Sequence, residues 1–472
     1  MKGAQMVRLG DVAESMKNGI YKSKDAYADD GIPCLRMYNI EAGGIVWRDI
    51  KRMTLTAQEL TDYGLESGDL LVNRVNSREL VGKTALITQS VGHCVFESKN
   101  IRVRLRRDLA EPAYVNYALL GFGHAHFDRN AQQVVGMASI SQPQVAAFEL
   151  TWRPLEQQRE VVAYLDEQLS RLDASVAALH RVQANLKRYR ASVLKAACEG
   201  RLVPTEAELA HQKGRNFETG AQLLQRMLEE RREKLAARGK SKEAVLAATA
   251  ALAALPDGWA WSSVEQLNPA ARPCAYGVLQ PGKDQSDGVR LVRVGDVNDG
   301  RVDTEGIKRI DPEIAAAYPR TKLSGGEVFI TLVGAIGRTA VVPASLAGAN
   351  TARAVGVIPL SSLVSAHWVE LWFRNPSTVA RMTAASHEVA RKTLNLEDVR
   401  LAAVALPPLA EQHRIVAEAD RRLSLIRATE LQVSANLARA KSLRQSILQA
   451  AFAAPGSVVG NDRNASKFIA KL

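Results

Sequence analysis

The sequence predicts an α+β fold in which two homologous α/β domains are separated by two long antiparallel coiled-coil helices. The first observation is an internal repeat, because residues 154–198 align without a gap on residues 408–452 with sixteen of forty-five positions identical. The second is an apolar seam at helical spacing in each copy. The third is that the blocks between the copies contain short apolar runs separated by Gly, Pro, Asn and Asp, which are typical of strands and turns.

The seam of the first copy includes Val162, Leu165, Leu169 and Leu172, which step by threes and fours. A period near 3.5 lets two helices wind around each other. A helix of some forty residues is about 60 Å long, and an exposed seam of that length needs a partner. The other copy is the nearest partner, so we expect an antiparallel pair with a pseudo-twofold axis. The alternative is that each helix packs only on its own domain.

The repeat continues more weakly upstream of both helices. GIPCLRMYNI from Gly31 parallels GVRLVRVGDV from Gly288, and residues 68–87 parallel residues 326–342 with three residues fewer. The apolar skeleton is kept while the intervening segments differ, which is the pattern of recognition loops on a rigid frame. We expect a first domain at 1–153, a central helix at 154–200, a helical connector at 201–255, a second domain at 256–407, a C-terminal helix at 408–454 and a disordered tail at 455–472.

The composition is that of an ordinary globular protein of 472 residues, with 46% hydrophobic residues and a net charge of +12. The surplus of positive charge lies mainly in the helical blocks, so the charge permits nucleic-acid binding without requiring it. The first residues contain no apolar segment typical of a signal peptide, and no stretch is long and apolar enough to suggest a membrane span. We therefore expect a cytoplasmic protein without membrane contact.

No catalytic residues and no metal ligands are predicted. The tripeptide Gly-Lys-Thr at 82–84 is not the end of a phosphate-binding loop, because Ser77 stands where the first Gly of that motif is required. The four cysteines are scattered and form no CxxC pair, and the eight histidines show no metal-ligand spacing. The chain is expected to hold no cofactor of its own.

The helix heads and their surroundings resemble a known family. PPLAEQHRIVAEAD from Pro407, followed by a seam helix and SLRQSILQAAFA at 442–453, is similar to the conserved region of type I restriction-modification specificity subunits. The first copy, which begins PLEQQREVVAYLDEQL at Pro154, resembles it too, although Arg153 replaces the first proline. LPDGWAWSSVEQL at 255–267 resembles the start of a second target-recognition domain. The resemblance covers nearly the whole chain apart from the tail after Pro455.

The resemblance implies a non-catalytic subunit that selects a sequence in double-stranded DNA. Each target-recognition domain would contact one half of a bipartite, asymmetric target. Two methyltransferase (M) subunits would dock on the helices, and two restriction (R) subunits would complete the complex. S-adenosylmethionine, ATP and Mg are then expected in these partners. The alternative is a coiled-coil structural adaptor that does not recognise DNA. A stand-alone methyltransferase or nuclease is disfavoured because no catalytic or cofactor motif is present.

Candidate contacts with DNA are polar, basic and aromatic residues of the divergent loops. In the first domain they are Lys17, Asn18, Tyr21, Lys22, Lys24, Asn73, Arg74, Asn76, Arg78, Gln132 and Gln133. In the second domain they are Arg272, Tyr276, Gln280, Lys283, Arg338, His387, Arg391 and Lys392. The run IRVRLR at 101–106 is interpreted either as a solvent-facing strand surface or as a set of phosphate contacts.

Candidate contacts with a partner protein lie on the two repeated helices. They are Glu156, Gln158, Arg190, Glu411, Gln412 and Arg444. For the Glu and Gln residues near the helix starts, capping of the helix is an equal alternative.

Overall fold

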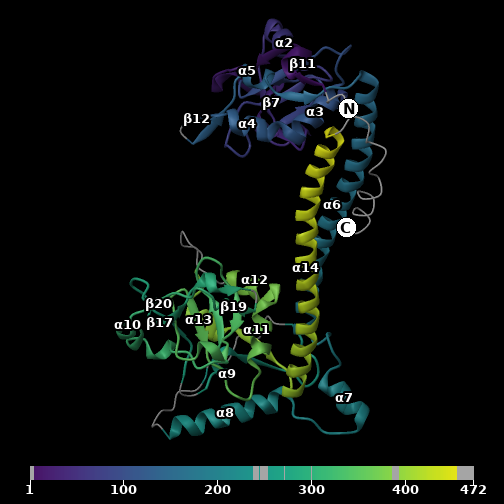
Figure 1. The fold of residues 1–472 in the computed structure, drawn as a ribbon. Helices are drawn as coiled ribbons and strands as arrows, with labels where there is room; N and C mark the ends of the chain where they lie inside the picture. The colour runs from purple at the N-terminus through teal and green to yellow at the C-terminus, as the bar shows by residue number, and fades with distance from the viewer. Residues whose placement is uncertain are drawn as a thin grey trace. The chain divides into compact units, whose positions relative to one another are not determined.

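The computed structural model describes residues 5–134, 136–237, 244, 253–269, 272–298, 300–384 and 393–453. The chain divides into two compact units, Met1–Val182 with Gln432–Leu472 and Gln183–Leu431. Figure 1 shows a strand-rich domain in each unit together with part of both long helices. The tail predicted at 455–472 and most of the connector segment 238–252 lie outside the described residues.

A four-stranded antiparallel sheet forms the centre of the first domain. Its strands lie in the order β2 (Ala13–Asn18), β11 (Asn100–Leu105), β7 (Leu70–Asn73) and β9 (Thr84–Leu86). Leu70, Val72 and Ile101 are completely buried and share one core with the helix α3 (Pro112–Ala118). Fully burying such a side chain stabilises a fold by roughly 1.5–3 kcal/mol, so this sheet fixes the shape of the domain.

Smaller sheets and short helices surround this sheet. The further strands are β10 (Val95–Phe96), β3 (Tyr27–Leu35) and β6 (Lys51–Met53) in one sheet, β12 (Gln132–Val134), β13 (Met137–Ser139) and β8 (Val75–Asn76) in a second, and the pairs β1 (Met6–Arg8) with β14 (Glu149–Thr151) and β4 (Ile40–Glu41) with β5 (Gly44–Ile45). The further helices are α1 (Leu9–Val12), α2 (Ala57–Tyr63), α4 (His124–Asn130) and α5 (Gln142–Ala146).

The second domain repeats this topology. Its central sheet has the order β16 (Ala275–Tyr276), β24 (Val355–Ile358), β21 (Val328–Thr331) and β22 (Thr339–Val341). The other strands are β20 (Arg309–Ile310), β17 (Val289–Val292) and β23 (Asn350–Thr351) in one sheet, and the pairs β15 (Ala260–Ser263) with β25 (Ala403–Leu406) and β18 (Val297–Asn298) with β19 (Arg301–Val302). The helices are α9 (Val264–Leu267), α10 (Pro312–Ala316), α11 (Ala366–Arg374), α12 (Pro376–Ala384) and α13 (Leu396–Leu401). The prediction of two homologous domains is confirmed.

The two predicted long helices are α6 (Leu155–Cys198) and α14 (Leu409–Phe452), each of 44 residues. In the first unit, Arg153 donates a 3.0 Å hydrogen bond to the carbonyl of Ala451, and Asp173 further along α6 pairs with Arg444. A residue later in α6 therefore contacts a residue earlier in α14, which shows that the two helices are antiparallel. Their seam packs Leu165, Leu169 and Leu172 into the same core as Ala440 and Ile447.

In the second unit the same helices pair again. Val193 and Ala197 of α6 share a core with Ile415 and Ala419 of α14. Arg190 of α6 forms an ion pair of 2.7 Å with Glu430 of α14. The predicted pairing of the two seams is therefore confirmed in each unit, and the alternative of helices packed only on their own domains is excluded.

The connector between α6 and the second domain forms two helices, α7 (Glu206–Lys213) and α8 (Gly220–Ala236). Thr205 and Thr219 cap these helices, since each side chain accepts a hydrogen bond from the backbone N–H three residues later. Leu223 and Met227 of α8 are buried in the core of the second unit. The predicted helical connector is therefore confirmed as helical, and α8 packs along one face on the second unit (α7 and α8 are labelled in Figure 1).

Candidate nucleic-acid interface

Four strand ends of the first domain meet at one edge of the central sheet. Asn18 ends β2 and Asn73 ends β7, whereas Asn100 and Thr84 begin β11 and β9. Neighbouring strands are antiparallel, with Asn73 opposite Asn100, so these four positions lie side by side. We call this edge with its loops the first sheet end, which comprises residues 17–22, 73–84, 97–100 and 132–142.

Backbone hydrogen bonds join these loops into one surface. The N–H of Ser98 donates to the carbonyl of Ile20 at 2.9 Å, and the N–H of Arg74 donates to that of Lys99 at 2.8 Å. The N–H of Ile140 donates in turn to the carbonyl of Arg74 at 2.9 Å. Segments that are far apart in the sequence are therefore held next to one another.

The second domain makes the same three bonds with different residues. The N–H of Arg353 donates to the carbonyl of Val278 at 2.9 Å, and the N–H of Leu332 donates to that of Ala354 at 2.8 Å. The N–H of Leu394 donates to the carbonyl of Leu332 at 2.9 Å. The second sheet end, residues 275–280, 331–339, 352–355 and 393–396, thus has the backbone arrangement of the first.

The side chains on the two sheet ends differ. The shared hydrogen bonds fix which positions correspond, and the corresponding pairs are Asn18 and Tyr276, Lys22 and Gln280, Arg74 and Leu332, Ser98 and Arg353, and Lys99 and Ala354. Hydrogen-bonding capacity, charge and size all change between the members of these pairs. One frame therefore presents two chemically distinct surfaces.

Several predicted residues of the first domain have exposed side chains on the first sheet end. They are Asn18, Tyr21, Arg78, Gln132 and Gln133. Tyr21 is 85% exposed. The amide oxygen of Asn18 accepts a 3.1 Å hydrogen bond from Gln142, and Arg78 forms a 2.7 Å ion pair with Asp128. Both contacts are exposed to water and hold these side chains at the surface.

The predicted lysines near the end of β2 turn toward α2. Lys17 pairs with Asp62 at 3.1 Å and lies 4.5 Å from the ring centre of Tyr63, and Lys22 pairs with Glu59 at 2.8 Å. The hydrogen bonds from these lysines hold the pKa of Asp62 and of Glu59 below their ordinary values. Both lysines are thus already neutralised within the domain. The side chain of Lys24, also predicted, lies outside the described part of the chain.

The prediction that Asn73 and Asn76 contact DNA is wrong, because both side chains belong to the buried interior of the domain. Asn73 is completely buried and donates to Asn100 at 3.1 Å and to the carbonyl of Lys99 at 3.0 Å. Asn76 is 7% exposed and donates to Asn73 at 2.8 Å. Buried amides need such partners, so these side chains are not available to a base. Arg74 is half-buried and directs its guanidinium to the carbonyls of Ile140 and Ser98.

In the second domain, Tyr276, Gln280, Lys283 and Arg338 are exposed. Arg272 is corrected, because it pairs with Glu327, which immediately precedes β21. The start of β21 is the edge of the sheet opposite to the second sheet end. The predicted His387, Arg391 and Lys392 lie outside the described residues.

The sheet ends also carry cations that were not among the predicted residues. Lys99 and Arg353, which follow the short strands β10 and β23, are examples. No simple sequence signal identifies them, because Glu97 and Ser98 separate Lys99 from its strand and the strand before Arg353 is the polar pair Asn350–Thr351. By contrast, the arginines of β11 face other strands and helices. Arg104 makes two hydrogen bonds to Asp69, at 2.8 and 2.9 Å, and Arg102 is 6% exposed, so they serve the domain itself.

Gln158 and Gln412, predicted as partner contacts, are corrected to internal clamps. Both side chains are completely buried. The amide oxygen of Gln158 accepts from the N–H of Glu111, and that of Gln412 accepts from the N–H of Ser365, each at 2.9 Å. Glu111 and Ser365 immediately precede α3 and α11. The two glutamines therefore fasten each long helix to its own domain in the same way, and neither can reach a partner.

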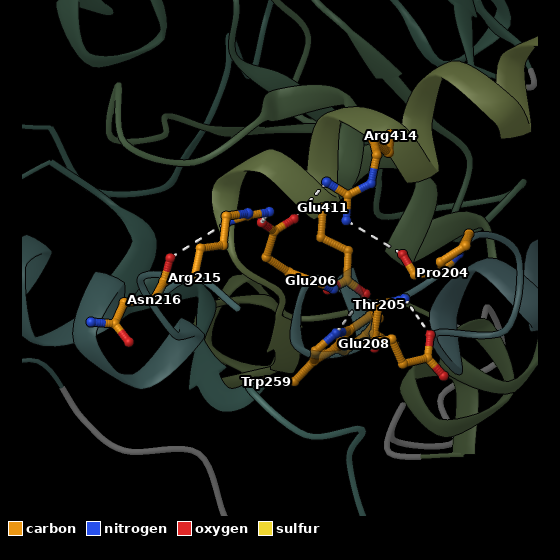
Figure 2. A network of polar contacts seen from close by, with 9 residues as sticks. All are labelled: Pro204, Thr205, Glu206, Glu208, Arg215, Asn216, Trp259, Glu411 and Arg414. Carbon is orange, nitrogen blue, oxygen red and sulfur yellow. Dashed lines mark hydrogen bonds and ion pairs between the residues drawn. The ribbon is translucent and has the colours of Figure 1, made fainter. Parts of the chain in front are cut away.

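Glu411 is likewise buried and inaccessible to a partner. Figure 2 shows its carboxylate beside α7, where it accepts hydrogen bonds from the Trp259 indole at 2.9 Å and from the Glu206 backbone N–H at 2.8 Å. The Glu206 carboxylate lies between the guanidinium groups of Arg215 and Arg414. Burial raises the pKa of Glu411. This network joins α7, α14 and the start of the second domain.

The remaining partner candidates occupy the surface of the helices to different degrees. The side chain of Glu156 is 80% exposed and pairs with Arg159. Arg190 and Arg444, which correspond in the repeat, both form ion pairs that cross from one long helix to the other. These two arginines therefore stabilise the helix pair, and their partial exposure leaves an edge of each at the surface.

Among the described residues, no helix combines the length and apolar character needed to cross a bilayer. In the same part of the chain, no group of three His, Cys, Asp or Glu side chains is arranged to hold a metal ion. The four cysteines are buried and unpaired as disulfides, and burial raises the pKa of Cys34 and of Cys94 to about 12.

Comparison with known proteins gives relatives of one kind. The EcoBI specificity subunit of Escherichia coli, a type I restriction enzyme subunit, is 29% identical over 451 residues, which cover 94% of this chain and 85% of the relative. The EcoKI specificity subunit of Escherichia coli strain K12 is 23% identical over 482 residues, covering 96% and 89%. No family model matches the chain.

Solved structures show the same fold. A chain from a type I R-M system studied for complex assembly and conformational transition has a TM-score of 0.59 at 18% identity, covering 95% of this chain and 97% of its own length. The HsdS subunit from Thermoanaerobacter tengcongensis has a TM-score of 0.50 at 17% identity, covering 96% and 97%. With its repeated domains and paired helices, this chain is similar over nearly its whole length to type I restriction enzyme specificity subunits and shares the fold of the two solved structures.

Proposed function

We propose that this chain is the DNA-recognition subunit of a type I restriction-modification complex, in which each domain contacts one half of a bipartite, asymmetric target. The observation that carries the proposal is the pair of sheet ends, which share their backbone hydrogen bonds and differ in their side chains. Sequence is recognised through contacts with base edges, and phosphate contacts position the protein. Two domains with the same backbone arrangement and different exposed side chains suit two half-sites of different sequence.

The exposed residues have the chemistry that base recognition requires. Asn and Gln pair with adenine and Arg with guanine through two hydrogen bonds, each such pair contributing roughly 1–3 kcal/mol of discrimination. Asn18, Gln132 and Gln133 supply amides in the first domain, and Gln280 and Arg353 supply an amide and a guanidinium in the second. Backbone and side-chain hydrogen bonds anchor the loops, which limits the entropy lost on binding.

The paired helices support the rest of the proposal. Two similar helices offer two similar docking surfaces, which suits two copies of one M subunit, and two R subunits would complete the complex. The repeat also favours half-sites separated by about one helical turn, roughly 10 bp. In this proposal the chain itself is non-catalytic and acts inside the cell. S-adenosylmethionine, ATP and Mg belong to the partner subunits.

Exchange of a single domain tests the proposal. Residues 1–153 are replaced by the equivalent domain of the EcoBI specificity subunit, and the methylated sequence is mapped genome-wide in cells that contain the M subunit. The expected result is a change in one half of the target with the other half retained. A change in both halves, or in neither, would contradict the assignment of one half-site to each domain.

A gel-shift titration of the complex with M separates this function from that of a structural adaptor. Binding of DNA should weaken steeply as salt rises, because neutralised phosphates release counterions. An adaptor would give no shift at any salt concentration.

A further inference from the structure

The same turn precedes the last strand of the central sheet in both domains. Gly82 and Gly337 have φ values of 82° and 81°, which favour glycine. The N–H of Gly82 donates to the carbonyl of Asn73 at 2.8 Å, and the N–H of Gly337 donates to that of Thr331 at 2.9 Å. Each turn closes a loop that leaves the sheet end, so the residue after the glycine occupies a fixed place.

That residue is Lys83 in the first domain and Arg338 in the second. The carbonyl of Lys83 accepts from the N–H of Asn73 at 2.7 Å, and that of Arg338 accepts from the N–H of Thr331 at 2.9 Å. The two cations therefore immediately precede β9 and β22 at identical backbone positions. Lys83 was not among the predicted contacts with DNA.

A cation at this place is retained, whereas the neighbouring positions change. Arg74 corresponds to Leu332 and Lys99 corresponds to Ala354, so other positive charges of the first sheet end are lost in the second. The bases of two half-sites differ, but the phosphates are alike. A group that contacts phosphate should therefore be common to both domains, and a group that contacts bases should not.

We propose that Lys83 and Arg338 are equivalent phosphate anchors, which seat the two domains on their half-sites in the same register irrespective of sequence. This inference rests on the proposed function and separates the residues that contact phosphate from those that contact bases. At the spacing of β strands, Lys83 lies roughly 14 Å across the sheet end from Asn18.

The surroundings of Arg338 suit an anion. An open cavity of about 340 Å³ borders it, and Arg374 also lines that cavity. Arg338 is held at the rim by a 2.9 Å hydrogen bond from its guanidinium to Asn298 and by one of 2.9 Å from its backbone N–H to the hydroxyl of Thr331. Arg374 pairs with Glu370 at 3.4 Å, so Arg338 carries the uncompensated charge of the rim.

Other retained arginines have a role in the fold. Arg52 donates to the carbonyl of Gly31 at 3.1 Å, and Arg309 donates to that of Gly288 at 3.0 Å. In contrast, the ammonium group of Lys83 makes no hydrogen bond or ion pair within the described residues. The exposed Lys51, retained as Lys308, lies on β6, outside the sheet end, and provides a matched control.

The test measures the DNA affinity of the complex with M by fluorescence anisotropy. Salt is varied from about 50 to about 200 mM, the range over which phosphate contacts change the affinity strongly. Variants Lys83→Ala and Arg338→Ala are compared with Lys51→Ala, on the cognate duplex and on duplexes altered in one half-site. Each anchor variant should lose affinity by the same factor on all duplexes and reduce the slope of log K against log salt by about 1. Lys51→Ala should match the wild type, and Arg338→Lys should retain most of the slope.

Three results would overturn the inference. They are an unchanged slope in both anchor variants, a loss confined to the cognate duplex, and a change in the methylated sequence in cells. Assembly with M, followed by size-exclusion chromatography, verifies that the variants fold. If the wild-type complex itself bound no DNA, the proposed function would fail. If the wild type bound DNA and the variants bound it equally well, only the inference about the two anchors would fail.

Discussion

The indole nitrogen of Trp259 donates a hydrogen bond of 2.9 Å to the buried carboxylate of Glu411. This bond ties the start of the second domain to the first turn of α14. The backbone N–H of Glu206 completes the environment of the same carboxylate. The orientation of the domain on its helix therefore depends on side chains that become protonated in acid.

Acid should destabilise the second unit through Glu206. Burial acts to raise the pKa of Glu206, but hydrogen bonds from Arg215 and Arg414 outweigh it and hold the pKa below its ordinary value of 4.5. A carboxyl whose pKa is lowered by folding contributes stability above its unfolded-state pKa and loses it as pH falls through the folded value. Below about pH 4.5, the melting temperature of the wild type should therefore fall more steeply than that of Glu206→Gln.

The control for that comparison is Glu233→Gln, which changes an exposed carboxylate of α8. Its melting curve should follow the wild type at every pH. Parallel pH dependence of the wild type and Glu206→Gln would show that the two guanidinium groups do not stabilise the ionised form of Glu206.

Removing either glutamine clamp should destabilise the unit that contains it. Gln158→Ala leaves the N–H of Glu111 and the carbonyl of Leu109 without their side-chain partner, and Gln412→Ala does the same to the N–H of Ser365. A buried polar group without a partner costs about 1–3 kcal/mol. Urea denaturation followed by hydrogen exchange in each unit measures the effect. Gln157→Ala, an exposed neighbour, should have none, and equal losses in all three variants would contradict the clamp.

The ion pair between Arg190 and Glu430 should contribute measurably to the helix pair. Both side chains are partly shielded, and their charged atoms lie 2.7 Å apart. Arg190→Glu should lower the melting temperature, since it places two carboxylates together, with a loss of about 1 kcal/mol or more. The exchange Arg190→Glu with Glu430→Arg should restore most of the loss. Additive losses in the double variant would show that the two residues act independently.

Substitution of an exposed sheet-end amide should relax recognition in one half-site alone. Gln280→Ala in the second domain is expected to reduce discrimination by roughly 1–3 kcal/mol at a single base pair, so that degenerate methylated sequences appear there. Asn18→Ala should do the same in the other half. Mapping of methylated sites in cells with each variant provides the measurement, and relaxation of both halves by one substitution would refute the separation.

The long helices and the domain skeleton were predictable because periodicity and repetition encode them directly. The seam through Leu165 and Leu169 has one helical solution, and the two copies confirm each other. Which polar residues are buried was not predictable. Asn73 and Arg74 are neighbours of similar polarity, yet the register of β7 against β11 places Asn73 wholly inside. Arg272 was misplaced for the same reason, because its partner Glu327 belongs to the opposite edge of the sheet.

The helix α7 was also not predicted individually. Its eight residues are too few for a clear period, and its position depends on contacts with α14 that lie some two hundred residues away. Lys83 could not be singled out from the sequence, although residues 68–87 align with residues 326–342, because alignment does not show which side chains lie at the sheet end. The hydrogen bonds to Asn73 and Thr331 place Lys83 and Arg338 at equivalent positions there.

The left-handed glycines at 82 and 337 have a practical consequence. They terminate loops of different length, yet the strands that follow begin in the same place. A chain built in this way tolerates new loop contents without refolding. Libraries confined to 78–80 or 334–335, which leave the buried Asn76 and Leu332 unchanged, should therefore yield variants that methylate a new sequence while the fold is kept.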